Sequence, residues 1–233
     1  MNIRVLVYNV HGFRSGADDV AAAVADARPD IALINECGSY RKLGRFAELM
    51  EMRATSTPLP RVRRAARNAI LVRRPWKVAA SRTVALPRGQ KRAYPRALLA
   101  AQVHDEYGAG ASLNVLCTHL GLLPGERAVH AGRILDTVAG TAGPLLIGGD
   151  LNERPGQPAA AAFGTRLWDT WIRVGPSTGE TFPASAPEAR IDYLFASEDL
   201  TPRRAVVLGS PAAKAASDHL PLVVDLANGY SSG

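Results

Sequence analysis

The sequence predicts an α/β protein whose layers include substantial antiparallel β-pairing. Apolar runs of strand length recur along all 233 residues, and helix-like segments separate only some of them. The expected order is β-α-β-α, then a run of strands, then β-α-β and further strands. A simple doubly wound parallel sheet would alternate strands and helices throughout, so this mixed order indicates layers with antiparallel neighbours.

Nine segments have the pattern of β-strands. Each is short, often β-branched, and bounded by Gly, Pro, Asn or Asp. In chain order they cover residues 3–7, 31–34, 69–72, 98–103, 113–117, 145–147, 193–195, 205–208 and 222–226.

Three segments have the pattern of helices. Residues 18–27 are rich in Ala and end before Pro29, and residues 40–50 carry apolar side chains at helical spacing. Residues 125–138 follow Pro124 and show the same spacing. These helices separate the first strand from the second, the second from the third, and the fifth from the sixth.

The composition indicates one folded domain. Apolar residues make up 47% of the chain and the mean hydropathy is −0.04, which argues against a disordered chain. No apolar stretch approaches the roughly 20 residues that span a bilayer. The segment Met1–Val10 has neither the apolar core nor the cleavage site of a signal peptide. We therefore expect one domain over residues 1–227, a loose tail over residues 228–233, a cytoplasmic location and no membrane span; no protein partner is evident.

Positive charge is concentrated between residues 61 and 96. The chain carries a net charge of +7, and this basic segment holds twelve Arg or Lys residues and no acidic residue. Such a cluster is typical of a surface that binds phosphate-rich partners. The alternative is an ordinary solvated face in a chain rich in Arg and Ala.

Polar or ionisable side chains stand at the ends of six predicted strands. They are Asn9, Glu36, His119, the pair Asp150 and Asn152, Asp192, and the pair Asp218 and His219. Loops at strand ends commonly carry function, because a rigid sheet holds their side chains in place. We therefore expect these positions to converge into one site.

This mixture of side chains suits the hydrolysis of a phosphoester. The reaction needs a hard cation on the phosphoryl oxygens, and the oxygens of Glu36 and Asp150 suit Mg²⁺ or Mn²⁺. It also needs groups that orient water and donate protons, which His119 and His219 can supply. Asp192 is the natural partner to fix the tautomer of His219 and raise its pKa.

Each of these residues also has a structural explanation when it is taken alone. Asn9 could be a strand-end turn residue, and Asp150 could cap a helix or form an Asx turn. His119 could be a satisfied, half-buried histidine, and Asp218 a simple cap. The coincidence of all six positions favours a shared site. Three further histidines do not belong to these strand-end positions, and we expect them to have no role in the site: His11, His104 and His130.

Eight segments, in this order, resemble the endonuclease/exonuclease/phosphatase superfamily. They are LVYNV (6–10), INE (34–36), RNAIL (67–71), CTHLG (117–121), IGGDLNERPG (147–156), TFP (181–183), RIDYLF (190–195) and SDHLPL (217–222). The resemblance covers residues 3 to 226. It implies a four-layer α/β sandwich, in which two packed mixed β-sheets are flanked by helices, and a metal-dependent phosphoesterase.

The resemblance also implies a role for each site residue. Glu36 is expected to be the principal metal ligand, joined by Asn9 and Asp218. Asp150 is expected to position or activate the attacking water, and His119 to contact the phosphate and protonate the leaving group.

The remaining positions are expected to hold the substrate. Asn152 would hold the phosphate and the water, and Asp192 would orient His219, which would stabilise phosphoryl charge or act as a base. Further phosphate- or substrate-binding positions are expected at Asn68, Arg88, Lys91, Arg92 and Arg96.

The motifs argue against two branches of the superfamily. Abasic-site endonucleases follow the metal-binding Glu with Thr and Lys, where this chain has Cys37 and Gly38. Inositol-polyphosphate phosphatases carry WxGDxNYR and PAWCDRI, which are absent here. The basic segment then favours a nuclease or phosphodiesterase acting on DNA or RNA.

Two alternatives remain open. One is a phosphodiesterase or phosphatase for a small-molecule or lipid head-group phosphate. The other is a catalytically silent binding module with the same fold, which the intact set of site residues disfavours.

Overall fold

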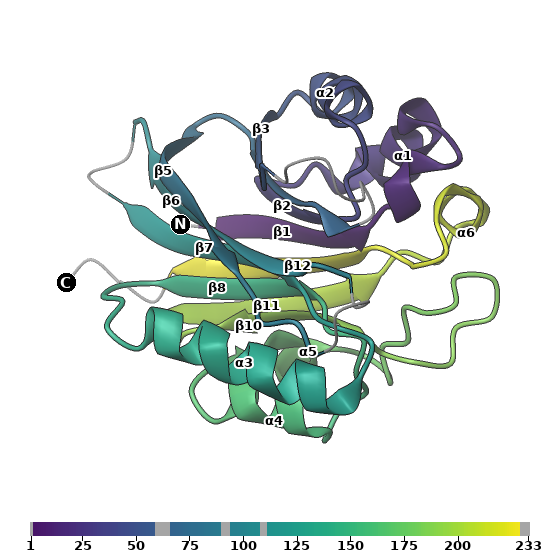
Figure 1. Cartoon of the computed structure of the whole chain (residues 1–233). Coiled ribbons are helices and arrows are strands. Elements are labelled where there is room, and N and C mark those ends of the chain that lie inside the picture. The colour runs from purple at the N-terminus through teal and green to yellow at the C-terminus, as the bar shows by residue number, and fades with distance from the viewer. Residues whose placement is uncertain (1, 59–65, 90–93, 108–110, 229–233) are drawn as a thin grey trace.

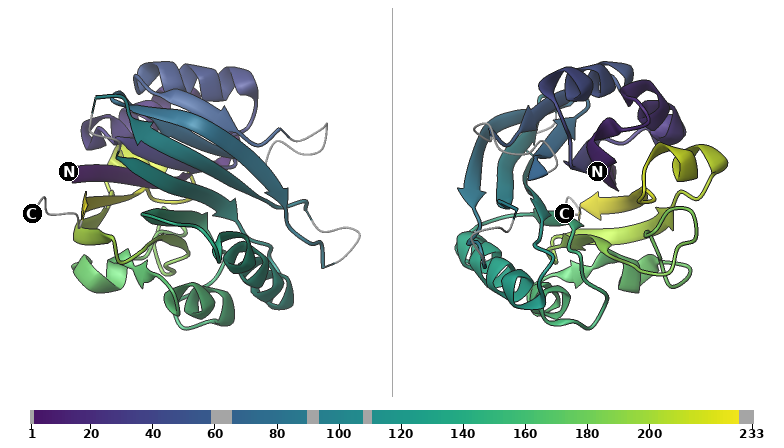
Figure 2. Two further views of the ribbon diagram at one scale, coloured as in Figure 1. Left: turned by 90° about the vertical axis from the view of Figure 1, so that its left-hand side faces the viewer. Right: turned by 45° about the vertical axis from the view of Figure 1, so that its right-hand side comes forward.

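Two six-stranded mixed sheets pack face to face, and helices cover their outer faces (Figure 1). This computed structural model describes residues 2–58, 66–89, 94–107 and 111–228. The further views show the same layers from other sides (Figure 2). The predicted four-layer α/β sandwich is therefore confirmed.

The first sheet is built around a parallel pair. Strands β1 and β2 run parallel, with Asn9 opposite Asn35 at their ends, and their other neighbours are antiparallel. In spatial order the sheet contains β11 (Leu200–Val207), β12 (Leu222–Asn228), β1 (Asn2–Asn9), β2 (Ile31–Asn35), β4 (Asn68–Val72) and β3 (Arg53–Ser56).

The second sheet has the same plan. Strands β7 and β8 run parallel, with His119 opposite Asp150, and β10 is antiparallel to β8. In spatial order the sheet contains β5 (Trp76–Ala85), β6 (Ala97–Asp105), β7 (Ser112–His119), β8 (Leu145–Asp150), β10 (Asp192–Ala196) and β9 (Trp168–Asp169).

The helices close the outer faces of the sandwich. The first sheet is covered by α1 (Ala17–Val24), α2 (Tyr40–Leu49) and α6 (Pro211–Ala216), and the second by α3 (Pro124–Val138) and α4 (Pro158–Gly164). Helix α5 (Thr170–Val174) adds Trp171 to the core between the sheets. Two short 3-10 turns lie at His11–Phe13 and Ala25–Ala27.

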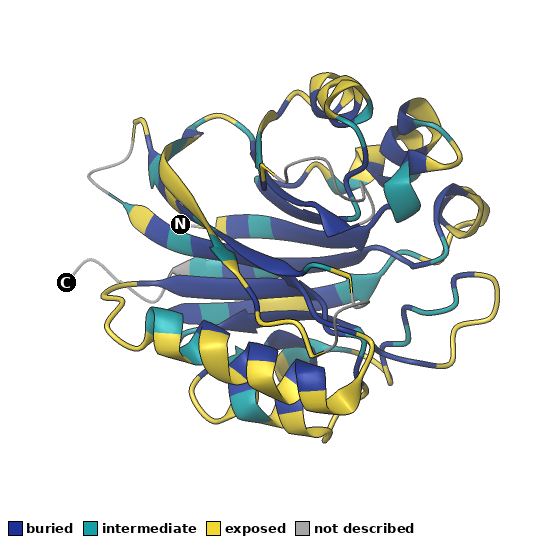
Figure 3. Cartoon of the chain, in the orientation of Figure 1, coloured by how far each residue is buried: buried dark blue, intermediate teal, exposed yellow. Residues whose placement is uncertain are grey.

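Both faces of the central strands are buried, which explains their continuous apolar runs. In β1, Val5 and Val7 belong to the core between the sheets, whereas Leu6 and Tyr8 pack under the helices of the first sheet. Strands with two buried faces need apolar residues at successive positions. Figure 3 shows this burial along the strands of both sheets, with exposed residues on the outer sides of the helices and on β5.

All nine predicted strands and all three predicted helices are present, but six further elements were missed. These are β3, β5, β9, α4, α5 and α6. Most of β5 is exposed, and Lys77, Ser81, Arg82 and Thr83 interrupt its apolar residues, so it has no long apolar run to mark it. At the other end of the chain, Asn228 pairs with Leu200 and belongs to β12, while the rest of the predicted tail, residues 229–233, lies outside the described residues.

Among the residues that the structure describes, no helix is both long and apolar enough to cross a bilayer.

Candidate active site

The predicted site residues gather at one end of the sandwich because the strands that carry them end together. The parallel pairs β1–β2 and β7–β8 place Asn9 beside Asn35, and His119 beside Asp150. Strand β10 is antiparallel to β8, so its first residue, Asp192, lies opposite Asp150. Side chains from both sheets therefore reach the same edge.

Asp150 is the centre of the cluster. Its Oδ2 accepts a hydrogen bond from Asn9 Nδ2 at 3.0 Å and lies 3.2 Å from His119 Nε2. The same oxygen lies 3.6 Å from His219 Nε2, and Oδ1 accepts from the backbone N–H of Asn152 at 2.8 Å. Burial alone raises the pKa of Asp150, but the two imidazoles outweigh it and hold that pKa below its usual range.

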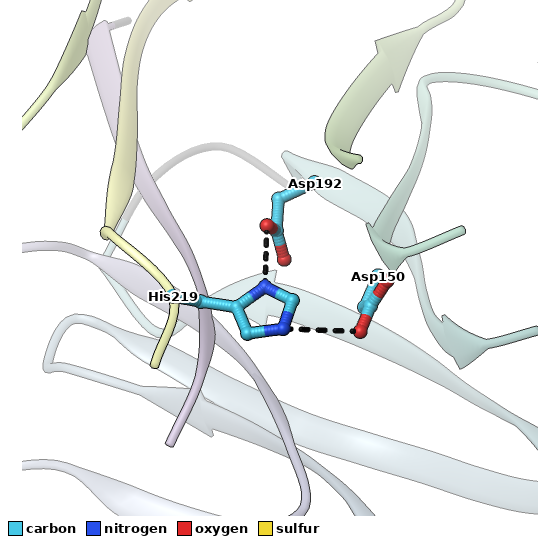
Figure 4. Close-up of side chains that lie close together, drawn as sticks. All are labelled: Asp150, Asp192 and His219. Atoms are coloured by element: carbon cyan, nitrogen blue, oxygen red, sulfur yellow. Dashed lines mark hydrogen bonds and ion pairs between the residues drawn. The ribbon is translucent and has the colours of Figure 1, made fainter. Parts of the chain in front are cut away.

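His219 lies between two buried carboxylates (Figure 4). Its Nδ1 is 2.8 Å from Asp192 Oδ2, and that oxygen also accepts a hydrogen bond from Thr181 Oγ1 at 2.6 Å. Burial lowers the pKa of His219, yet the attraction of Asp192 and Asp150 is larger and raises the pKa to about 10. The ring is therefore an imidazolium at neutral pH, with Nε2–H directed at Asp150.

Glu36 and Asp218 form a second, more open part of the site. Glu36 has φ +53°, which turns the chain at the end of β2, and its Oε1 accepts from Asn9 Nδ2 at 3.3 Å. Asp218 Oδ1 lies 3.4 Å from His11 Nδ1, and the side chain of Asp218 is 42% exposed. Ser217 Oγ donates to the carbonyl of Asn9 at 2.7 Å and joins the two segments.

This open part fits a hard divalent cation. Mg²⁺ and Mn²⁺ prefer oxygen ligands and keep several waters, so a site needs one or two carboxylates with solvent access. Glu36 and Asp218 offer such carboxylates, and Asn9 Nδ2 holds the Glu36 carboxylate in place. The cluster of Asp150, Asp192 and His219 also has ligand atoms within 4.8 Å of one another, but His219 already bridges its two carboxylates. The donor set at Glu36 is thus the better match for a metal.

Backbone geometry fixes Asp150 in place. Asn35 Oδ1 accepts the N–H of Asp150 at 2.8 Å, and Asn35 Nδ2 donates to the carbonyl of Thr118 at 2.9 Å. Gly149 has φ +137°, and a Cβ there would lie 1.9 Å from the Thr118 carbonyl. Only glycine allows the strands to approach this closely, which explains the second Gly of the GGDLN motif.

The sequence that forms this site also matches a known protein family. The model of the Endonuclease/Exonuclease/phosphatase family matches residues 6–219. The chain belongs to this family. Its members are phosphoesterase-type hydrolases. A search of curated proteins finds no match to the sequence.

Solved structures share the family fold. An endonuclease/exonuclease/phosphatase from Beutenbergia cavernae is 27% identical, with a TM-score of 0.76 over 98% of this chain and 72% of that one. The mannosyl-6-phosphatase of Bacteroides thetaiotaomicron is 18% identical, with a TM-score of 0.82 over 97% and 99% of the two chains. D. rerio TDP2, complexed with single-strand DNA product, is 18% identical, with a TM-score of 0.79 over 97% and 99%.

Arg96 also belongs to the site end of this family member. It precedes β6, is 7% exposed, and its Nε has no hydrogen-bond partner among the described residues. Burial lowers the pKa of Arg96, while the charges of Asp150 and Glu36 oppose that shift. A buried guanidinium beside these carboxylates is suited to hold an anionic group.

The other predicted substrate positions differ in their surroundings. Asn68 is fully buried, and its Nδ2 donates to the carbonyl of Ala97 at 2.7 Å, so it joins the two sheets. Arg88 is exposed in the segment after β5. Lys91 and Arg92 lie outside the described residues.

The described basic residues of segment 61–96 do not all lie on one exposed surface. Arg67 is buried and donates to the carbonyls of Gly38 and Thr57, and Arg73 donates to the carbonyls of Pro29 and Met50. Both therefore serve the fold. Lys77 pairs with His104 at the end of β6 that is remote from Arg96. A count of charges does not distinguish such internal arginines from arginines on the surface.

Three residues of the site were missed by the sequence analysis. His11, taken as an ordinary histidine, pairs with Asp218, and Thr181 bonds Asp192. Asn35 holds the backbone of Asp150. Thr181 and Asn35 belong to the motifs TFP and INE, so the sequence analysis included both residues but assigned neither a role in the site. For His11 the signal is its position two residues after Asn9, in a turn that Asn9 Oδ1 caps at 3.1 Å.

Proposed function

We propose that this family member is a divalent-metal-dependent phosphoester hydrolase that cleaves a P–O bond by attack of water on phosphorus. The main support for this proposal is the set of groups around one oxygen. Asp150 Oδ2 lies within 3.6 Å of a donor from each of Asn9, His119 and His219. An ionised carboxylate that faces two imidazoles can hold a water on one side of a phosphorus atom while the imidazoles contact its oxygens.

The roles follow from these contacts. Asp150 holds the attacking water and takes its proton as the new P–O bond forms. His119 gives its Nε2 proton to the leaving oxygen as the old P–O bond breaks. His219, held charged by Asp192, donates to a phosphoryl oxygen and stabilises the negative charge that develops there. Asn152, fixed by its bonds to Asp150 and to the Leu120 carbonyl, orients the phosphate.

Glu36, Asn9 and Asp218 are the proposed metal-binding residues. A Mg²⁺ or Mn²⁺ ion bound there would neutralise charge on the phosphoryl oxygens. Asn9 contacts both Glu36 and Asp150, so it connects the metal site to the residue that holds the water.

A phosphodiester of nucleic acid is the proposed substrate. The net charge of +7, the exposed Arg88 and the buried Arg96 favour a polyanion. The zebrafish relative of the same fold was solved with a DNA product. Among the described residues, Arg88 and Arg96 are the arginines that support this substrate, because Arg67 and Arg73 bond backbone carbonyls within the fold.

A small phosphoester is the second candidate. A cavity of about 200 Å³ opens beside Glu36, and its lining includes the cationic residues Arg14 and Lys42 together with His11. This volume suits a small anionic group better than a polymer. The Bacteroides relative is a mannosyl-6-phosphatase, which gives the same fold a small phosphorylated substrate.

The decisive experiment compares the wild-type protein with Asp150→Ala and with Asp136→Ala, whose exposed carboxylate lies on α3. Hydrolysis of a single-stranded oligonucleotide, a chromogenic phosphodiester and a sugar phosphate is followed with EDTA, Mg²⁺ or Mn²⁺. We expect metal-dependent turnover by the wild type and the control, and a loss of about 10³-fold or more in Asp150→Ala.

The best substrate decides between the two candidates. Turnover by Asp150→Ala equal to that of the control would overturn the proposed role of Asp150. A wild type that binds an oligonucleotide but hydrolyses none of the three substrates would instead support a silent binding module.

A further inference from the structure

Two buried residues of α3, Glu126 and His130, contact the loops beside the active site although the proposed reaction does not use them. His130 is fully buried, and Glu126 is 7% exposed. Both lie on the helix that begins five residues after His119 and covers the second sheet (Figure 1).

His130 joins two loops. Its Nδ1 accepts a hydrogen bond from the N–H of Gly121 at 3.3 Å, and its Nε2 lies 2.6 Å from the carbonyl of Pro87. Since Nδ1 is an acceptor, the proton must be on Nε2, which then donates to Pro87. Burial lowers the pKa of His130, which favours this neutral tautomer. One ring thus satisfies a donor on one loop and an acceptor on the other.

Glu126 makes a parallel connection. Its Oε1 accepts the N–H of Gly89 at 3.2 Å, so it holds the residue two positions after Pro87. The other oxygen lies against Gly121, where an added Cβ would be 2.0 Å from Oε2. A side chain at position 121 would therefore have to displace the carboxylate of Glu126.

The two connected loops both lead to the site. Gly121 comes two residues after His119. The second loop leaves β5 at Ala85 and returns to β6 through Arg96, and its base is closed by a hydrogen bond from Leu86 N to the Arg96 carbonyl at 3.0 Å. Arg88 lies between the two residues that α3 holds, and its side chain is exposed.

We propose that Glu126 and His130 are positioning residues, which fasten the Pro87–Gly89 segment to Gly121 and so hold Arg88 beside the active site as a contact for the phosphate backbone of a polymeric substrate. This inference rests on the proposed phosphodiesterase function and adds a specificity element to it. A small ester does not extend to Arg88. The contacts of Glu126 and His130 should therefore affect the binding of long substrates alone.

The test compares His130→Ala with His130→Gln in steady-state hydrolysis of a single-stranded oligonucleotide and of a chromogenic phosphodiester. A glutamine amide supplies one donor and one acceptor, as the neutral ring does. We expect His130→Ala to raise KM for the oligonucleotide about tenfold, the loss of one charged phosphate contact, with kcat nearly unchanged. Both constants should stay unchanged for the small ester, and His130→Gln should restore KM. Glu126→Ala should show the same KM increase.

Arg88→Ala completes a double-mutant cycle. If His130 acts by placing Arg88, the double variant should have the same KM as either single variant. A KM of the double variant equal to the product of the two separate increases would overturn the proposal. An unchanged KM in His130→Ala would also overturn it. An equal loss of kcat with both substrates that His130→Gln does not repair would show a merely structural role.

Hydrogen exchange separates this proposal from the proposed function. The Gly89 and Gly121 amides should exchange faster in His130→Ala than in the wild type or in His130→Gln. Unchanged exchange of these two amides would show that His130 does not hold the two loops together. If the wild type hydrolyses none of the substrates, the proposed function fails, and the exchange result still decides whether His130 holds the two loops together.

Discussion

At the scale of single residues, the charge of His219 shows how the site controls proton positions. A buried imidazole normally loses its proton more readily, because burial disfavours the charged form. Asp192 at 2.8 Å and Asp150 at 3.6 Å reverse this and raise the pKa to about 10. The pair Asp192–His219 was predicted from the sequence, because both residues flank strands of the site. The pairing of His11 with Asp218 was not, since only the fold brings together residues so far apart in the chain.

The raised pKa predicts a pH dependence of stability. The folded pKa of His219 is above its ordinary value of 6.5, so the stabilisation is complete below pH 6.5 and is lost as pH rises through about 10. Asp192→Asn keeps an acceptor for Thr181 but removes the charge. We expect the difference in free energy of unfolding between wild type and Asp192→Asn to be largest below pH 6.5 and to shrink toward pH 10.

Urea denaturation in EDTA at intervals of pH measures this difference. Asp136→Asn, an exposed change on α3, should show no such trend. A difference that stays constant from pH 6 to about pH 10 would contradict the charged state of His219.

At the scale of elements, the sequence was informative where an element buries both of its faces. Strands β1, β2, β7 and β8 are continuous apolar runs, and the polar residue after each run marks the site. Strand β5 could not be found this way, because most of it is exposed and polar side chains such as Arg82 interrupt its apolar residues. The two-residue strand β9 and the short helices α4 to α6 have too few residues to show a period.

Helix α3 also supports the loop after Asp150, and this contact gives a stability prediction. Arg127 Nε donates to Glu153 Oε1 at 2.9 Å, and Glu153 Oε2 accepts the first N–H groups of α4, from Ala159 at 2.6 Å and Ala160 at 3.0 Å. Arg127→Met leaves a buried carboxylate without its cation. We expect a loss of about 3–5 kcal/mol in the free energy of unfolding.

The matched control is Arg133→Met, an exposed position on the same helix. Urea denaturation should leave this variant within about 0.5 kcal/mol of the wild type. Equal stability of the two variants would mean that the Arg127–Glu153 pair does not hold the loop.

At the scale of the whole molecule, polar side chains join the two sheets at the site end of an otherwise apolar core. Asn35 Nδ2 donates to Asn68 Oδ1 and to the Thr118 carbonyl, both at 2.9 Å, and Asn35 Oδ1 accepts from Asp150. The sequence could not predict this, because a strand-end asparagine has no pattern that names a partner on another sheet. It assigned Asn68 to the substrate for the same reason.

This bridge predicts that stability and activity depend on the same residue. Asn35→Ala leaves the buried N–H of Asp150 and the Thr118 carbonyl unpaired, and each unpaired group costs about 1–3 kcal/mol. Because Asn35 holds Asp150 itself and the residue before His119, we also expect turnover to fall by about 10²-fold. Asn114→Ala is the control, since Asn114 also bonds backbone carbonyls but at the opposite end of β7. A variant at position 35 that loses stability while keeping full turnover would show that the sheets can separate there without moving Asp150.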